Sequence, residues 1–296
     1  MKSSSGNTTK KVVAIGMLGV GKSTLLNCVV DLKAAGDDAA PFLAKDSAEG
    51  VTQGFRALPS TIPGVEVIDT PGLCDPDMEL PVWTQRYNEQ MASSPDRREV
   101  SLVVFIIPPQ SRVSANEKML AAVAHEAFQS IDAKNMVLVV NKAAPQYTAA
   151  KALANYDKMR DSVTNCSLPP LTEDRILVLP AVPYEPQPEG DIQPTIALSQ
   201  RFKAFVAAHM PPGSQTVRAK QANLNAIVES SQDAAVRQEM SRMRSEWAAD
   251  RARIEKEAEK RVQKAKAQEV NFGAAVAKGL AEVLLAPIKI VASLFG

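Results

Sequence analysis

The chain alternates short apolar runs with longer amphipathic segments between residue 11 and about residue 210. This alternation is typical of strands and helices that build a mostly parallel sheet. Runs rich in Val, Ile and Leu that are too short for buried helices predict the strands. The predicted strands are Lys11 to Ile15, Val65 to Ile68, Leu102 to Ile107, Met136 to Val140 and Arg175 to Leu179. We therefore expect an α/β fold with helices on both faces of the sheet.

Helices are predicted between these strands. Ser114 is followed three residues later by Glu117, a capping-box arrangement that opens a helix running to Ala127. Two more helices are predicted over Thr148 to Val163 and Thr195 to Ala208. A proline-rich stretch, Tyr184 to Pro194, predicts a surface loop between the fifth strand and the last helix.

The character of the chain changes at the Pro-Pro-Gly sequence that follows Met210. Residues 214–270 are dense in Arg, Lys, Glu, Gln and Ala, and Gln215 to Glu269 contains neither proline nor glycine. This composition predicts a long charged helix. Its apolar stripe is thin, so it fits either a coiled coil or a solvated helix with one packed edge.

Residues 271–296 are apolar again, and their charges form one narrow strip on a helical wheel. Pro287 and these charges make the segment a poor bilayer-spanning helix. It suits a helix that lies in a membrane interface or binds a partner, and it equally suits one that packs on the rest of the protein.

Composition and charge narrow the class of protein. Lys and Arg number 34 against 33 Asp and Glu, so no overall positive field favours nucleic-acid binding. The three cysteines are scattered without metal-ligand spacing, which indicates a reducing compartment. Residues 1–10 are polar and lack an apolar signal region, so we expect a disordered leader and a cytoplasmic protein. His125 and His209 have no ligand spacing, and we expect both to be packing or surface residues.

The candidate chemistry begins directly after the first predicted strand. Gly16 to Ser23 reads G-x-x-x-x-G-K-S and is followed by helix-forming residues. Such a loop points backbone N–H groups at phosphate oxygens, its lysine adds a positive charge, and its serine hydroxyl can bind Mg2+. The bound phosphates would lie at a helix N-terminus. The candidate nucleotide-binding residues here are Gly16, Gly19, Val20, Gly21, Lys22, Ser23 and Thr24.

Further loops have the order of a nucleotide switch. Asp69 ends a predicted buried strand and is followed by Thr-Pro-Gly, so its carboxylate can hold the Mg2+ shell and Gly72 can contact a γ-phosphate. Thr52 lies in the polar loop before that strand and can donate its hydroxyl to the metal. Asn141 and Lys142 end the fourth predicted strand as the first half of an N-K-x-D base-recognition motif. The candidate metal ligands are thus Ser23, Thr52 and Asp69.

These motifs together resemble those of P-loop GTPases, and within them the septin-like branch of AIG-type GTPases (GIMAPs) and chloroplast-envelope Toc receptors. The resemblance covers residues 11–210 and includes the stretch Val65 to Asp75. Pro109 to Lys118 looks like the family's G-R-F-T-x-E-x-K box. The resemblance implies a Ras-like domain, Mg2+ with GTP or GDP as ligands, and a homodimer formed across the nucleotide face.

Two residues depart from the pattern. Leu73 stands where Ras-like enzymes carry a water-orienting glutamine, so we expect slow hydrolysis by the isolated chain. The resemblance offers Arg112 as a finger acting on the partner's γ-phosphate, and an ordinary surface arginine is the alternative. Ala144 replaces the aspartate that would pair with guanine, which lowers base discrimination by about 1 to 3 kcal/mol.

The leading hypothesis is a GTPase of low intrinsic activity, with Lys22, Thr52, Gly72 and Arg112 as its catalytic residues. A second hypothesis is a scaffold that binds nucleotide without hydrolysing it and assembles on membranes through its C-terminal helices. An ATP-dependent enzyme is the third. No nucleic-acid partner is expected.

Overall fold

The computed structural model describes residues 9–30, 42, 54–73, 80–95, 97–129, 131–180, 185–186, 192–193, 196–212, 215–230, 238 and 256. The chain divides into two compact units, Met1–Glu239 and Met240–Gly296. Lys256 is the one described residue of the second unit.

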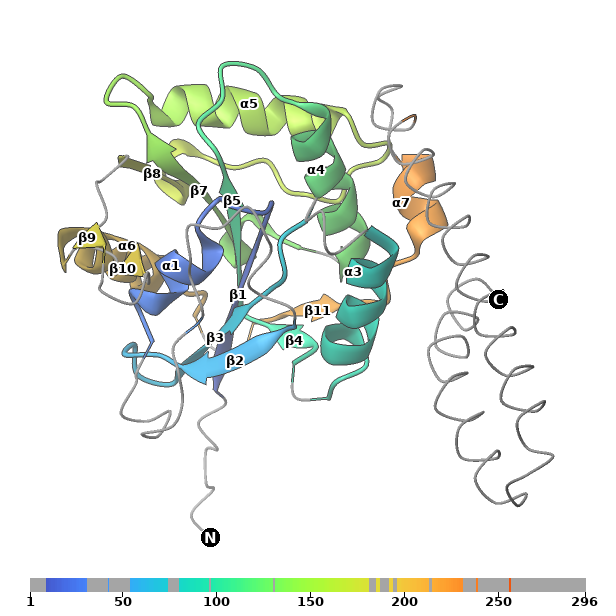
Figure 1. Cartoon of the computed structure of the whole chain (residues 1–296), viewed down its shortest axis with the longest axis horizontal. Coiled ribbons are helices and arrows are strands. Elements are labelled where there is room, and N and C mark those ends of the chain that lie inside the picture. The colour runs from blue at the N-terminus through green and yellow to red at the C-terminus, as the bar shows by residue number, and fades with distance from the viewer. Residues whose placement is uncertain are drawn as a thin grey trace, which may run out of the picture. The chain divides into compact units, whose positions relative to one another are not determined.

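A six-stranded sheet runs through the first unit in the order β2-β3-β1-β5-β7-β8 (Figure 1). β2 is antiparallel to β3, and all other neighbouring strands are parallel. The five predicted strands are confirmed, and the edge strand β2 is an addition to them. The strands are β1 Lys10–Gly16, β2 Arg56–Pro59, β3 Val65–Asp69, β5 Leu102–Ile107, β7 Met136–Ala143 and β8 Ile176–Pro180.

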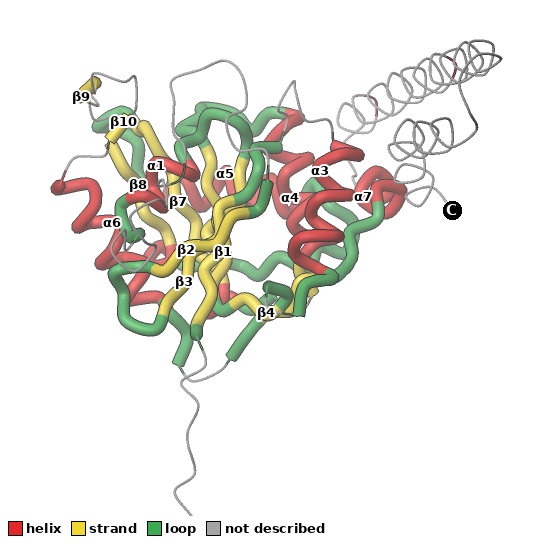
Figure 2. The backbone as a smooth tube through the Cα atoms, turned by 60° about the horizontal axis from the view of Figure 1, so that its bottom comes forward, coloured by secondary structure: helices red, strands yellow, loops and turns green. Residues whose placement is uncertain are grey.

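Helices lie on both faces of the sheet, which is the predicted Ras-like arrangement (Figure 2). The helices are α1 Lys22–Asn27, α3 Leu80–Tyr87, α4 Ala115–Ala127, α5 Ala149–Asp161 and α6 Ile196–His209. On one face, Val12 and Val104 pack with Leu26 of α1 and Phe202 of α6 in one buried cluster. On the other face, Phe105 makes an edge-to-face contact with Tyr156 of α5, with ring centroids 6.2 Å apart. Neighbouring residues of a strand thus pack into opposite layers.

The predicted helix starts at Ser114 and Thr148 are confirmed by their caps. The hydroxyl of Ser114 accepts the N–H of Glu117 at 3.4 Å, and the Glu117 carboxylate accepts the N–H of Ser114 at 2.8 Å. The hydroxyl of Thr148 accepts the N–H of Lys151 at 3.3 Å. These bonds satisfy backbone donors that have no partner within the helix.

α1 is shorter than its sequence suggests. Apolar residues continue to Val30, but the helix ends at Asn27. Val30 forms an isolated antiparallel bridge with Ser60. The side chain of Asn27 exchanges two hydrogen bonds with the backbone of Phe42, at 2.7 and 2.9 Å. Pairing with distant chain segments therefore takes the place of the next helical turn.

The remaining elements are short. They are the π-helix η1 Asn88–Ala92, the 3-10 helices η2 Ala133–Asn135 and η3 Glu173–Arg175, the strands β4 Glu99–Val100, β6 Phe128–Gln129, β9 Glu185–Pro186, β10 Ile192–Gln193 and β11 Val217–Ala219, and the helix α7 Leu224–Ser230. β9 and β10 form a two-stranded antiparallel sheet within the predicted proline-rich loop.

The predicted long helix is wrong at its beginning, because Val217–Ala219 form strand β11. β11 is the central strand of a three-stranded antiparallel sheet, between β4 and β6. Val217 and Ala219 are buried and Arg218 is exposed, the alternation of a half-buried strand. Pairing with β4 and β6 therefore outweighs the helical propensity of a charged segment.

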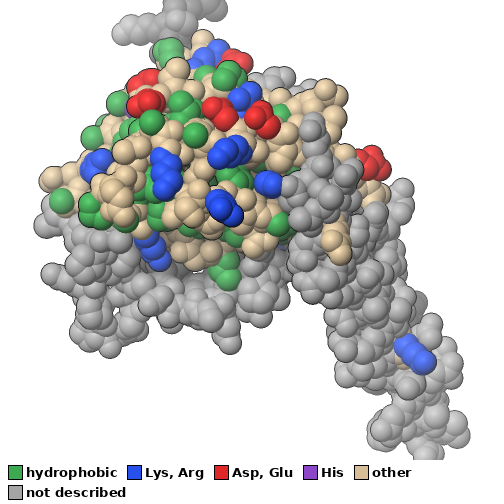
Figure 3. Space-filling view, turned by 90° about the horizontal axis from the view of Figure 1, so that it is seen from above, with side chains coloured by type: hydrophobic (Ala, Val, Ile, Leu, Met, Phe, Trp, Pro, Cys, Tyr) green, Lys and Arg blue, Asp and Glu red, His purple; other side chains and the backbone are tan. Residues whose placement is uncertain are grey.

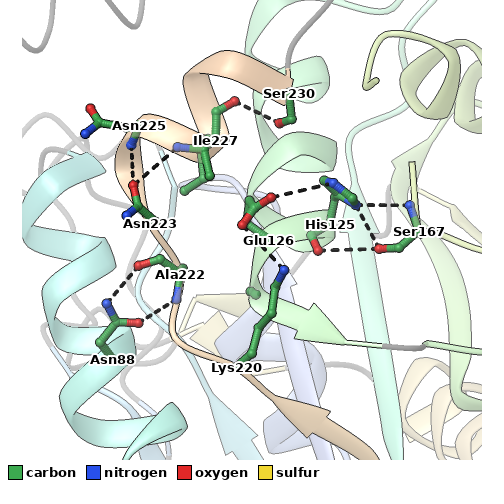
Figure 4. Close-up of polar contacts among 12 residues, drawn as sticks. Asn88, His125, Glu126, Ser167, Lys220, Ala222, Asn223, Asn225, Ile227 and Ser230 are labelled. Carbon is green, nitrogen blue, oxygen red and sulfur yellow. Dashed lines mark hydrogen bonds and ion pairs between the residues drawn. The ribbon is translucent and has the colours of Figure 1, made fainter. Parts of the chain in front are cut away.

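The segment 217–230 is held on the domain by side-chain and backbone bonds (Figure 4). The amide of Asn88 donates to the carbonyl of Ala222 at 2.9 Å and accepts its N–H at 2.8 Å. The ammonium of Lys220 lies 3.5 Å from the carboxylate of Glu126 on α4. The N–H of Thr164 donates to the carbonyl of Ser230 at 2.6 Å. The folded unit therefore continues past residue 210.

Several sequence predictions concern residues outside those described. These are the leader up to residue 8, the loop that carries Thr52, the apolar tail 271–296, and the charged helix beyond residue 230 apart from two single residues. Within the part of the chain that the structure describes, no helix combines the length and the apolar character needed to cross a bilayer.

Asn88→Ala should lower the free energy of unfolding by about 1 to 3 kcal/mol, because the N–H and C=O of Ala222 lose their partner. Denaturant melts of the full chain measure this change. Gln85→Ala on α3, the helix directly before η1, is the control, since it removes only an exposed bond to Glu89. Equal stabilities of Asn88→Ala and wild type would contradict the conclusion that Asn88 holds the segment 217–230 on the domain.

His125 should make the free energy of unfolding fall as the pH drops below about 6.5, the ordinary pKa of a histidine imidazole. Burial lowers the pKa of His125, an effect that Glu126 opposes and Lys220 supports, and Nδ1 accepts the N–H of Ser167 at 3.0 Å. Below pH 6.5, His125 therefore binds a proton more readily in the unfolded chain than in the folded chain. Above that pH, His125 is neutral in both states and does not contribute to the pH dependence. Thermal melts of wild type and His125→Gln between pH 5 and pH 8 test this, with a flatter profile expected for the variant.

Candidate functional site

The predicted phosphate loop follows β1 and turns into α1. Gly19 and Gly21 have φ angles of 74° and 87°, the left-handed region that glycine adopts at little cost. Gly21 directly precedes the first helical residue, and its carbonyl accepts the N–H of Leu25 at 2.9 Å. The backbone of Gly16 to Ser23 therefore has the curled form that its glycines predict.

Lys22 and Ser23 are placed by different contacts. The side chain of Lys22 is buried, and its ammonium donates to the carbonyl of Met17 at 3.0 Å, across the loop. The hydroxyl of Ser23 donates to Oδ2 of Asp69 at 2.6 Å. Asp69 is fully buried at the end of β3, and its Oδ1 accepts the N–H of Thr70 at 3.0 Å. The loop after β1 and the acid after β3 thus meet in one place.

This pair of oxygen ligands fits a magnesium site. Mg2+ prefers hard oxygen atoms and is usually held by one or two protein groups together with substrate phosphates. The Ser23 hydroxyl and the Asp69 carboxylate supply such groups. Thr24 is buried in the first turn of α1 and Val20 is buried within the loop. Thr52, the third predicted ligand, lies outside the described residues.

The loop that contains Gly72 runs against the phosphate loop. The N–H of Leu18 donates to the carbonyl of Leu73 at 2.9 Å, and the N–H of Leu73 donates to the carbonyl of Gly16 at 3.1 Å. A Cβ atom on Gly72 would lie 2.7 Å from the Cα of Leu18 and 2.9 Å from its backbone nitrogen. Only glycine therefore allows this approach. Leu73 itself is buried, so its side chain faces the protein rather than a bound nucleotide.

Two side chains that the sequence did not single out hold the loop after β3. The hydroxyl of Thr70 donates to the carbonyl of Ala14 in β1 at 2.8 Å. The indole N–H of Trp83 in α3 donates to the carbonyl of Pro71 at 3.0 Å. Trp83 also stacks on Tyr87, with centroids 5.3 Å apart. The only sequence signal for this anchor is a tryptophan shortly after the motif.

Asn141 and Lys142 reach the phosphate loop from the end of β7. The Asn141 amide donates to the carbonyl of Val20 at 3.0 Å, and the Lys142 ammonium lies 3.4 Å from the carbonyl of Gly19. Lys142 has a φ angle of 63°, and the β7–β8 register shifts at this point. The backbone of Asn141 and Lys142 therefore does not follow the regular ladder with β8. The structure therefore brings the two predicted base-site residues to the phosphate loop.

Arg112 lies in the loop between β5 and α4, with an exposed side chain. The carboxyl ends of the parallel strands form one edge, so this loop and the phosphate loop follow neighbouring strands at the same edge. Viewed toward the end of the molecule that is uppermost in Figure 1, the described surface carries Lys and Arg side chains near its middle, with Asp and Glu side chains close to them (Figure 3).

The described cysteines take no part in this site as nucleophiles. Burial raises the pKa of Cys28 to about 11, and it also raises the pKa of Cys166. A thiol must ionise to act as a nucleophile, so both are in the inert form at neutral pH.

The part of the chain that carries the phosphate loop and the switch motifs is similar to known sequences. Residues 11–142 match the family described as "50S ribosome-binding GTPase". GTPase Era of Clostridium kluyveri is 23% identical over 206 residues, 67% of this chain and 64% of the relative. GTPase Era of Thermoanaerobacter is 28% identical over 141 residues, 46% of this chain and 40% of the relative. The chain thus spans less than two thirds of the length of these relatives.

Solved structures give similarities of low identity. Toc33 from Arabidopsis thaliana in complex with GDP and Mg2+ has a TM-score of 0.45 and 13% identity, over 72% of this chain and 88% of that chain. Toc33 in complex with Mg2+ and GMPPNP has a TM-score of 0.45 and 14% identity, over the same shares.

Gly72→Ala should lower the free energy of unfolding by about 1 to 3 kcal/mol, because the new methyl group meets the backbone of Leu18 rather than a flexible side chain. Gly54→Ala is the control, since its methyl group would make only an ordinary contact of 3.4 Å with the Gln90 side chain. Thermal denaturation measures both. Identical stabilities of the two variants would contradict the close contact between the loops.

Proposed function

We propose that this chain, whose residues 11–142 match a GTPase family, binds GTP and GDP with Mg2+ and hydrolyses GTP slowly. The observation that carries the proposal is the 2.6 Å hydrogen bond between Ser23 of the phosphate loop and Asp69 of β3. Two motifs separated by 46 residues meet there with the oxygen ligands that a magnesium nucleotide needs. The family match supports guanine nucleotides as the ligands.

The residues would act by positioning and by charge. Water attacks the γ-phosphorus, the bond from that phosphorus to the bridging oxygen breaks, and GDP, phosphate and a proton are released. Lys22 and the N–H groups of Gly19 to Thr24 would hold the phosphate oxygens. Ser23 and Asp69 would hold Mg2+, which supplies charge stabilisation when it is bound, and Gly72 would offer an N–H to the γ-phosphate.

The box at Pro109 to Lys118 supports a finer proposal. We propose an AIG-type enzyme that dimerises across its nucleotide face, where Arg112 acts on the γ-phosphate held by the second chain. The exposed side chain at the nucleotide edge supports this role, since an arginine finger that acts on a second chain must reach out of its own chain. For the chloroplast translocon components atToc33 and psToc159, dimerisation is important for the GTPase activity.

Burial of Leu73 favours a second candidate, a scaffold that binds nucleotide without hydrolysing it. The side chain is 1% exposed and cannot orient water. Assembly on membranes through residues 271–296 belongs to this candidate and stays a prediction from the sequence, since that tail lies outside the described residues.

Single-turnover GTP hydrolysis, measured over a range of concentrations of the full chain, tests the proposal. The rate should rise with protein concentration, and Arg112→Ala should lower it by about 100-fold or more. Arg201→Ala, which removes an exposed arginine on α6, should leave it unchanged.

Other outcomes separate the candidates. Nucleotide binding without turnover at any concentration would favour the scaffold. A rate that is independent of concentration and insensitive to Arg112→Ala would contradict dimer activation. Calorimetry that detects no binding of GTP or GDP at micromolar concentrations would contradict both candidates.

A further inference from the structure

The base end of the nucleotide site contains an amide and a lysine but lacks the carboxylate of the N-K-x-D motif. Asn141 and Lys142 lie where the β7–β8 register shifts, with side chains on the phosphate loop. Ala143 returns to the ladder opposite Pro180 and is buried. Ala144 follows on the exposed side. A methyl group therefore stands at the motif's fourth position.

Hydrogen bonds fix the backbone conformation around residue 144. The N–H of Tyr147 donates to the carbonyl of Ala144 at 2.9 Å, which closes a turn over residues 144–147. The Tyr147 hydroxyl accepts the amide N–H of Asn155 at 3.1 Å, and the same amide donates to the carbonyl of Gln110 at 2.9 Å. The turn is thus tied to the loop that carries Arg112. The Cβ atom of any side chain at position 144 would therefore have a fixed position.

Among the described residues, the groups at this end do not favour guanine over adenine. One N–H of the Asn141 amide donates to Val20, and its second N–H can donate to N7, an acceptor that guanine and adenine share. The Oδ1 of Asn141 is buried and has no hydrogen-bond partner among the described residues. An acceptor of this kind does not favour guanine, whose adjacent O6 is also an acceptor, whereas adenine carries an amino group there.

An aspartate at position 144 would act on both purines in opposite directions. Its carboxylate would accept the N1–H and the 2-amino group of guanine, a bidentate and charge-assisted pair. Adenine has a lone pair at N1 and no 2-amino group, so the same carboxylate would repel it. Alanine removes both effects, and each good bidentate pair contributes about 10- to 100-fold in discrimination.

We infer that this nucleotide site accepts adenine as well as guanine nucleotides, and that residue 144 sets this permissiveness. The inference rests on the proposed function, because it concerns the base of the same nucleotide. It names the substrate class of the site as purine nucleoside di- and triphosphates, selected by their phosphates. Inosine diphosphate, which lacks only the 2-amino group of GDP, should bind as tightly as GDP.

Calorimetric titration of the full chain with GDP, IDP and ADP in Mg2+ tests the inference. Wild type should bind the three with dissociation constants within about tenfold of one another. Ala144→Asp should raise the preference for GDP over ADP by at least about tenfold and should make GDP tighter than IDP. Ala144→Asn is the matched control, since it has the same size without the charge, and its change should be smaller.

The Asp variant should fold, because residue 144 is exposed and Asp is favoured at the first position of a turn. A wild-type preference for GDP over ADP above about 100-fold would overturn the inference. An unchanged preference in Ala144→Asp would overturn the role of residue 144. Absence of binding by all three nucleotides would instead contradict the proposed function.

Discussion

The arrangement of the site depends on the close backbone contact between the loop after β1 and the loop after β3. β1 and β3 are parallel neighbours, so both loops leave the sheet at the same edge. Hydrogen bonds between Leu18, Leu73 and Gly16 then continue the pairing beyond the strands. Because Gly72 lacks a side chain, the backbones can approach closely enough for Ser23 to reach Asp69.

The parts of this site that the sequence predicts are those encoded in consecutive residues. The G-x-x-x-x-G-K-S loop and the D-T-P-G turn each follow an apolar strand, and the order of those strands fixes the edge at which they meet. Ser114 and Glu117 predict the start of α4 for the same reason, since a cap is a local bond. Features that neighbouring residues form by themselves can be predicted from the sequence alone.

The parts that could not be predicted depend on contacts between distant segments. Nothing around Leu18 indicates that its backbone limits residue 72, and a tryptophan shortly after the motif does not specify the carbonyl of Pro71 as its partner. The strand at 217–219 lies in a segment whose composition favours helix, and only its partners β4 and β6 make it a strand. Tertiary pairing of this kind outweighs local propensity.

The central position of β11 determines where this chain can be divided. A fragment that ends at Met210, where the composition changes, would leave β4 and β6 without the strand between them. Their N–H and C=O groups would then form open sheet edges, which readily pair with other chains and cause aggregation. Such a fragment would also lose the contact of Asn88 with Ala222. Strand pairing, and not the Pro-Pro-Gly sequence, therefore determines how far along the chain the folded unit extends.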